Sequence, residues 1–154
     1  MLSNKLFSTI VEHTPLISID LIIRNYQQQV LLGKRINRPA QSYWFVPGGR
    51  ILKDESFEQA FNRLVKGELG FDSKMSEARF LGPFEHHYDN NFSGTGFTTH
   101  YVVLAFELRL DCDIEHLPNI QHDNYQWFSE TDLLKSDTVH NHTKWYFQSE
   151  KYIK

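Results

Sequence analysis

The chain has 154 residues, of which 40% are hydrophobic and 14% aromatic, enough for one globular domain with a core and too apolar for a disordered segment. Its 16 basic and 19 acidic residues give a net charge of −3, and neither sign is concentrated in a run, which argues against nucleic-acid binding. One cysteine excludes an internal disulfide and fits a reducing compartment, and the N-terminus has the pattern of neither a signal peptide nor a membrane span. We therefore expect a single domain over residues 1–154, cytoplasmic and without a membrane partner.

Hydrophobic periodicity divides the first half of the chain into helices and strands. The predicted elements are a helix from about Leu2 that ends before Thr14-Pro15, strands over Leu16–Arg24 and Val30–Lys34, a short strand over Trp44–Val46, and a helix over Ser56–Leu69. Ser3 is a candidate N-cap for the first helix, and Gly70 is a natural end for the second.

The second half predicts two longer strands and a helical C-terminal region. The expected elements are strands over Ala78–Tyr88 and Phe97–Leu110 joined by the polar loop Asp89–Gly96, a strand over Tyr125–Phe128, and helices over Ser129–Leu134 and Thr143–Tyr152. Because His86 and His87 are adjacent on a strand, they should face opposite ways. His140 and His142 are interpreted as the solvated start of the last helix. Strands interleaved with a few helices indicate an α/β (α+β) sandwich rather than regular βαβ winding.

One stretch has the composition and spacing of a chemical site. Gly48 and Gly49 follow a predicted strand, and Glu55, Arg63 and Glu68 come after them. A glycine turn lets backbone carbonyls approach a cation, and carbonyl and carboxylate oxygens are ligands that Mg²⁺ prefers. An arginine beside such a cation would help to neutralise a diphosphate. The stretch therefore predicts a magnesium-dependent site for a phosphorylated substrate.

These residues resemble the Nudix box, G-x5-E-x7-R-E-U-x-E-E-x-G-U, with two departures. Leu64 stands where the box has a glutamate after the arginine, and Gly67 stands at the first position of the Glu-Glu pair. Of these three carboxylates only Glu68 remains. A glycine inside a helix costs about 1 kcal/mol relative to alanine, so Gly67 is not explained by helix propensity.

From about Thr14 to about Trp127 the chain resembles one Nudix family, the GDP-mannose mannosyl hydrolases, which lack the same two glutamates. The strings that carry the resemblance are Leu32-Gly33-Lys34-Arg35, Asn37-Arg38-Pro39-Ala40-Gln41, Tyr43–Arg50, Tyr88–Thr95, Phe97–Val103 and Gln121-His122-Asp123. The resemblance implies the Nudix fold, a mixed β-sheet sandwiched between α-helices. It also implies hydrolysis of GDP-mannose, and of GDP-glucose, to GDP and free sugar through attack of water on the anomeric carbon with inversion.

The same resemblance implies roles for individual residues. The metal ligands would be Gly48 through its carbonyl, Glu68 and Gln121, holding one Mg²⁺ for which Mn²⁺ can substitute. His122 would be the general base. Arg35, Arg50 and Tyr101 would contact the diphosphate and leaving group, Asp20 and His86 would lie near the sugar, and Tyr88 or Phe92 would stack on guanine. Arg63 would orient Glu68. A homodimer is implied on the same basis.

Two other functions fit the same residues. A conventional Nudix pyrophosphohydrolase would cut the diphosphate and leave GMP and sugar 1-phosphate, although Leu64 and Gly67 argue against the multi-metal chemistry that this reaction favours. A non-catalytic nucleotide-sugar binding module would keep the fold without turnover, although retention of Glu68, Gln121 and His122 argues against it. The choices between mannose and glucose, and between guanine and other bases, stay open.

Overall fold

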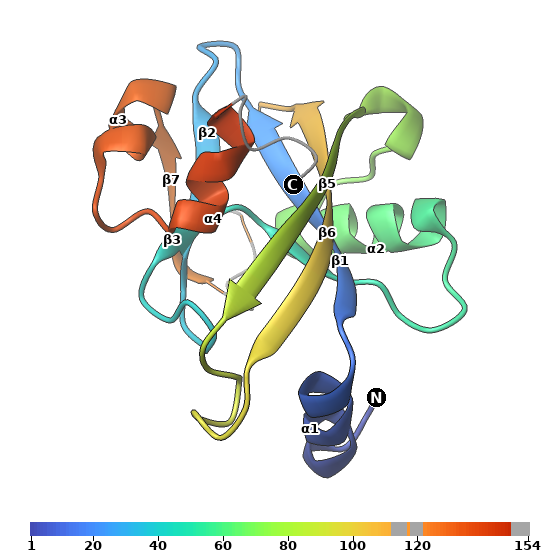
Figure 1. The fold of residues 1–154 in the computed structure, drawn as a ribbon. Coiled ribbons are helices and arrows are strands. Elements are labelled where there is room, and N and C mark those ends of the chain that lie inside the picture. Colours follow the sequence, from blue (N-terminus) through green and yellow to red (C-terminus); the bar gives the residue numbers. More distant parts are fainter. Residues whose placement is uncertain (112–116, 118–121, 149–154) are drawn as a thin grey trace.

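A computed structural model describes residues 1–111, 117 and 122–148 (Figure 1). The helices and strands, in chain order, are α1 (Asn4–His13), β1 (Leu16–Arg24), β2 (Val30–Arg35), β3 (Trp44–Phe45), β4 (Gly48–Arg50), α2 (Phe57–Leu69), β5 (Arg79–Tyr88), β6 (Thr99–Arg109), β7 (His122–Phe128), α3 (Glu130–Lys135) and α4 (Asn141–Lys144). Two 3₁₀ turns, η1 (Met75–Glu77) and η3 (Trp145–Phe147), complete the described elements.

The strands form one mixed sheet. Its main path is β3-β2-β1-β6-β5, while β4 pairs with β1 and β7 pairs with β2. The β1–β6 pairing is parallel over the whole of β1, and the pairings of β1 with β2 and β4 are antiparallel. No described helix is long and apolar enough to cross a membrane.

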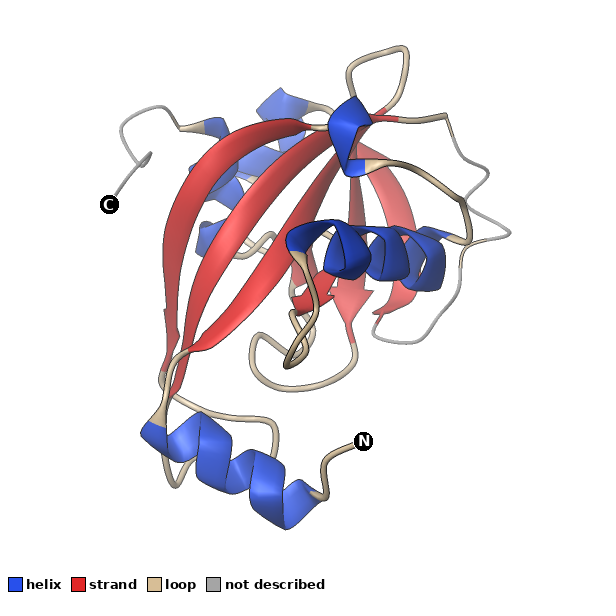
Figure 2. Cartoon of the chain, turned by 90° about the vertical axis from the view of Figure 1, so that its right-hand side faces the viewer, coloured by secondary structure: helices blue, strands red, loops and turns tan. Residues whose placement is uncertain are grey.

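Alternation along β1 divides the core into two layers. Ile19, Leu21 and Ile23 pack on α2, whereas Ile22 packs with Leu133 and other residues of the C-terminal segment. Figure 2 shows the sheet between α2 on one face and the C-terminal helices on the other, with α1 at one end. This arrangement confirms the predicted mixed sheet between helices.

Helix α2 is specified by signals at both ends. The Ser56 hydroxyl accepts from the Gln59 N–H at 3.1 Å while the Gln59 side chain accepts from the Ser56 N–H at 2.8 Å, which is a capping box. Gly70 ends the helix in the left-handed region, at φ 77°. The predicted helix is confirmed, with Ser56 as its N-cap.

Two local predictions are wrong. Residues 48–50 were expected to form a glycine turn, but they form strand β4, paired with β1 from Ser18 to Asp20. Over its described residues, the last predicted helix (Thr143–Tyr152) is the end of the four-residue helix α4 followed by the η3 turn, and Gln148 is already extended. Local helix propensity is overridden there because the aromatic side chains of η3 pack separately into the second core layer. Residues 149–152 of that prediction lie outside the described residues.

Candidate active site

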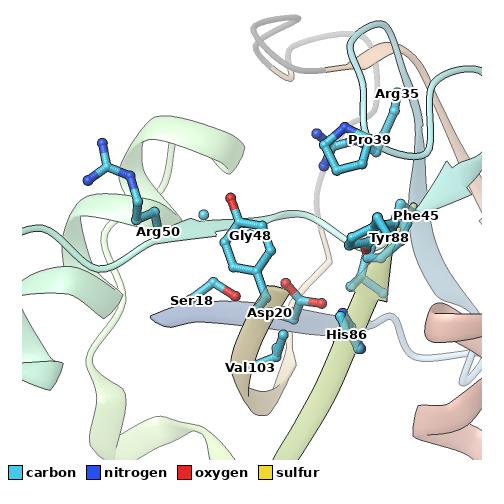
Figure 3. A pocket seen from close by; sticks show the side chains of 13 residues that line it. Ser18, Asp20, Arg35, Pro39, Phe45, Gly48, Arg50, His86, Tyr88 and Val103 are labelled. Atoms are coloured by element: carbon cyan, nitrogen blue, oxygen red, sulfur yellow. The ribbon is translucent and has the colours of Figure 1, made fainter. Parts of the chain in front are cut away.

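A cavity of about 220 Å³ lies against β1 on the face covered by the C-terminal segment. We call it the sheet cavity. Figure 3 shows Asp20 and His86 on its floor, with Arg35 and Arg50 on opposite sides of its opening. Its lining comes from β1, β2, β4, β5 and β6 and includes Ser18, Asp20, Arg35, Gly48, Gly49, Arg50, His86, Tyr88, Tyr101 and Val103. The structure thus brings together most of the residues that the sequence singled out.

Asp20 is the acidic group of the sheet cavity. It is 7% exposed, and its carboxylate accepts a short hydrogen bond from the Tyr146 hydroxyl. Burial raises the pKa of Asp20 to about 7, against the opposing effects of the Tyr146 hydrogen bond and the Arg35 charge. A carboxylate in this environment suits hydrogen bonding to a polar ligand, because its own solvation is incomplete.

Three histidines surround the floor of the cavity on the C-terminal side. His86 stacks on His142 with ring centroids 4.4 Å apart, and His142 lies 4.5 Å from His140. Burial is the main cause that lowers the pKa of all three rings. The pKa of His86 lies well below its usual value, that of His140 is about 4, and that of His142 is about 3. The three rings are therefore neutral at pH 7. The prediction that His140 and His142 are solvated is wrong for His142, which is only 7% exposed, whereas His140 is half-buried. His86 is buried and His87 exposed, as strand alternation predicted.

Two arginines provide the positive charge of the sheet cavity. The Arg35 Nε is buried and has no hydrogen-bond partner in the described part of the chain. The guanidinium of Arg50 lies 4.9 Å from the ring centroid of Phe7, on α1. Tyr101, whose pKa is raised by burial, is the third predicted diphosphate contact and lines the same cavity. An oxyanion entering the cavity would meet these donors together, and it would satisfy the Arg35 Nε.

Two of the predicted metal ligands, Gly48 and Glu68, lie on β4 and α2, two elements that contact each other. The Leu21 N–H donates to the Pro47 carbonyl, and Asp20 and Gly48 are the next pair along the same two antiparallel strands. Because hydrogen-bonded and non-hydrogen-bonded pairs alternate in such a ladder, the Gly48 carbonyl points away from β1. Glu68, 6% exposed, has its pKa raised to about 7, first by burial. A buried carboxylate and an outward backbone carbonyl are both oxygen donors that Mg²⁺ accepts.

The two departures from the box have clear structural roles. Leu64 is buried in the core and packs against Gly49, where an added Cβ would lie 2.5 Å from the Leu64 Cδ2. Gly67 is exposed and has open space around its missing side chain. Among the three box positions, only Glu68 therefore offers a carboxylate to the site.

Arg63 makes its contacts with a neighbouring glutamate and a backbone carbonyl. Its guanidinium donates to both Glu55 oxygens, at 2.6 and 3.0 Å, and to the Arg50 carbonyl at 2.8 Å. Glu55 also accepts from the Leu52 N–H at 2.8 Å. These bonds hold the loop between β4 and α2, and the positive charge of Arg63 also lowers the pKa of Glu68.

The two aromatics expected to stack on guanine lie in different places. Tyr88 is part of the sheet cavity. Phe92 lies in a neighbouring cavity of about 350 Å³, where its ring centroid is 4.9 Å from that of Phe7. We call this second space the aromatic cavity; it is lined by Phe7, Val11, Arg35, Asn37, Arg38, Pro39, Phe92, Thr99 and Tyr101. Arg35, Pro39 and Tyr101 border both cavities, so a single ligand can extend from one to the other.

Two predicted residues, Gln121 and His122, are neighbours in the sequence. Gln121 lies outside the described residues. His122 begins β7, where its backbone is paired with that of Arg35 across a register shift. This pairing places the start of β7 beside a residue of the sheet cavity.

Sequence reasoning missed Tyr146, His142 and Phe7. Tyr146 is 126 positions from Asp20 in the chain, so no local pattern could associate the two. The run Trp145-Tyr146-Phe147 was a usable signal, because three consecutive aromatics do not fit one face of a solvated helix.

Comparisons with known proteins agree with this architecture. The NUDIX domain family matches residues 14–148. Low-salt glycan biosynthesis protein Agl8 of Haloferax volcanii is 45% identical over 107 residues, which are 70% of this chain and 67% of that protein. The RNA pyrophosphohydrolase of Orientia tsutsugamushi (strain Boryong) is 26% identical over 87 residues, 51% of this chain and 53% of that protein.

Solved structures show the same fold. The crystal structure of MutT protein from Methanosarcina mazei Go1 matches with a TM-score of 0.71 over 89% of this chain and 94% of that chain, at 22% identity. The family match covers most of the chain and includes β1, β4 and α2, which build the site. The chain belongs to the Nudix hydrolase family.

Proposed function

We propose that this protein hydrolyses a GDP-sugar, GDP-mannose and also GDP-glucose, to GDP and the free sugar by attack of water on the anomeric carbon. The observation that carries the proposal is the state of the two altered box positions. With Leu64 in the core and Gly67 lacking a side chain, α2 keeps one box carboxylate of three, Glu68. A site with fewer carboxylates suits stabilisation of a leaving diphosphate better than multi-metal attack at phosphorus. The similarity to a protein named for glycan biosynthesis supports a sugar-containing substrate.

In this mechanism the arginines bind the part of the substrate that leaves. Arg35 and Arg50, on opposite sides of the cavity opening, donate to diphosphate oxygens, and Tyr101 donates its hydroxyl to the same group. As the C–O bond breaks, its electron pair passes to the diphosphate oxygen, where these donors stabilise the charge. Asp20 and His86, on the cavity floor, hold hydroxyl groups of the sugar.

His122 takes a proton from the attacking water. An imidazole has a pKa near neutrality, which is suited to this transfer. Inversion follows because water enters on the face opposite the leaving diphosphate.

Nudix hydrolases generally use a divalent metal such as Mg²⁺. In this chain the Gly48 carbonyl and Glu68 would hold it, with Gln121 as a third ligand. When bound, the cation supplies positive charge that stabilises the departing diphosphate.

The nucleobase is assigned to the aromatic cavity, where Phe92 would stack on guanine. Phe92 is preferred to Tyr88, since Tyr88 lines the sheet cavity, which the diphosphate and sugar would fill. The family resemblance extends the proposal to a homodimer, and the single cysteine is the basis for placing the protein in the cytoplasm.

Hydrolysis in ¹⁸O-water, with Mg²⁺ and GDP-mannose or GDP-glucose, tests the bond that is cut. We expect the label in the free sugar, unlabelled GDP, and inverted configuration in the first-formed sugar by NMR. Label in GMP or sugar 1-phosphate would instead identify a pyrophosphohydrolase, the activity named for the Orientia relative. Unchanged substrate after long incubation would favour a binding module.

A further inference from the structure

The Tyr146 hydroxyl lies between two groups of the cavity floor. It donates a short hydrogen bond to the Asp20 Oδ2, and its oxygen is 3.3 Å from the His86 Nε2. Tyr146 is 3% exposed and comes from η3, far along the chain from both partners. One phenol therefore links the carboxylate of β1 with the imidazole of β5.

Proton counting fixes the direction of both bonds. An ionised Asp20 can only accept, so Tyr146 must give its single proton to that bond, and the Tyr146 oxygen can then only accept from His86. The neutral His86 ring must then have its proton on Nε2. The opposite tautomer would require Tyr146 to donate to His86, and the carboxylate would lose its donor.

Both partners of Tyr146 are also restrained on their other sides. A Cβ built on Gly48 would lie 2.6 Å from the Asp20 Oδ1, so the carboxylate lies directly against the β4 backbone. The His86 ring is stacked on His142 and has the Phe45 ring edge-on at 6.0 Å. The shared hydroxyl adds a further restraint on the rotation of both side chains.

We propose that Tyr146 is a positioning residue that holds the Asp20 carboxylate and one tautomer of His86 in a fixed arrangement on the cavity floor. This inference rests on the proposed function, in which the two groups hold the sugar. It deepens that function, because a fixed acceptor beside a fixed imidazole selects a ligand by the placement of its hydroxyl groups. Tyr146 itself acts through these two groups.

A first test needs neither a variant nor activity. In ¹⁵N-histidine-labelled wild-type protein, long-range ¹H–¹⁵N spectra report the tautomer of each ring, and His86→Gln identifies the His86 signals. We expect a protonated Nε2 on His86. A protonated Nδ1 would overturn the assignment, because Tyr146 would then donate to His86.

The second test is Tyr146→Phe, which removes one hydroxyl and keeps the ring that packs edge-on against Phe84 at 4.7 Å. Loss of a hydrogen bond to a charged group predicts that kcat falls about 10- to 100-fold. We expect GDP affinity to change less than about twofold, since GDP lacks the sugar, and KM for the GDP-sugar to change less than kcat. Tyr26→Phe, at a residue 74% exposed, is the matched control and should leave all three unchanged.

The outcomes separate this inference from the proposed function. A kcat within about twofold of wild type would overturn the positioning role while leaving GDP-sugar hydrolysis intact. A wild-type protein that turns over no GDP-sugar would overturn the proposed function, and the tautomer measurement would still decide the arrangement around Tyr146. If Tyr146→Phe does not fold, the wild-type spectra decide the same point.

Discussion

His122 is the residue on which the proposed chemistry depends most directly. It begins β7, where its backbone pairs with that of Arg35, so the proposed base and a proposed diphosphate contact come from neighbouring strands of the sheet. The sequence suggested His122 through family resemblance alone. A lone histidine in a polar run gives no physical reason to expect catalysis, and only its strand position can be checked against the fold.

His122→Gln should lower kcat by about 10²–10⁴, the usual contribution of a positioned base, with little change in KM. Steady-state kinetics on GDP-mannose measures both constants. His13→Gln, at an exposed position on α1, is the control and should behave as wild type. A near-wild-type kcat for His122→Gln would remove this residue from the role of base.

At the scale of elements, the contact between α2 and β4 decides the geometry of the candidate metal site. Gly48 and Gly49 form a strand because neither has a side chain that would clash with its neighbours. Gly48 lies close to Asp20 on β1, and Gly49 lies close to Leu64 on α2. Sequence reasoning recognised the glycines but assigned a turn, since β-propensity counts against glycine in strands. Tertiary crowding, which no local pattern contains, is the reason for the difference.

Two glycine substitutions should affect the stability of this junction in opposite directions. An alanine Cβ at Gly48 would overlap the Ile19 carbonyl oxygen, so Gly48→Ala should lower the free energy of unfolding by about 1–3 kcal/mol. Gly67→Ala meets no atom within 4 Å and should raise it by about 0.4–1 kcal/mol, as for a glycine in a helix. Urea unfolding without added metal measures both. Equal effects of the two changes would contradict this account of the junction.

At the scale of the whole molecule, the sequence predicted the sheet and most helices because hydrophobic alternation and end signals are local. The C-terminal layer was predicted least well. There, His140, His142 and Tyr146 meet residues of β1 and β5 that are distant in the chain, and their burial depends on those contacts. The lowered pKa values of buried His86 and His142 and of half-buried His140 also make the molecule as a whole sensitive to acid.

The folded-state pKa of His142 lies below its unfolded value, so the folded protein binds fewer protons. Its contribution to stability is complete above about pH 6.5 and is lost as the pH falls towards about 3. His142→Phe keeps a stacked ring but has no group that can bind this proton. When the pH is lowered from 6 to 5, the free energy of unfolding should therefore fall by about 1 kcal/mol less in the variant than in wild type. The pKa values of Asp20 and Glu68 are raised, so their effect on the pH dependence of stability is opposite to that of His142. This effect is the same in wild type and variant, so it cancels in the comparison.

Urea unfolding at a series of pH values gives this difference directly. His13→Phe, at the exposed α1 position, should follow the wild-type curve. Parallel curves for His142→Phe and wild type would show that His142 is not held neutral by the fold.

The parallel pairing of β1 with β6 determines when the parts of the candidate site can assemble during synthesis of the chain. Leu16 pairs with Tyr101 and Arg24 with Arg109, so β1 must wait for the whole of β6 to be synthesised before its nine-residue ladder can close. Tyr146 emerges later still. Asp20 is synthesised before β6 and η3, so its hydrogen bond to Tyr146 can form only after η3 has been made. A nascent chain halted before η3 would have the sheet without a finished cavity floor.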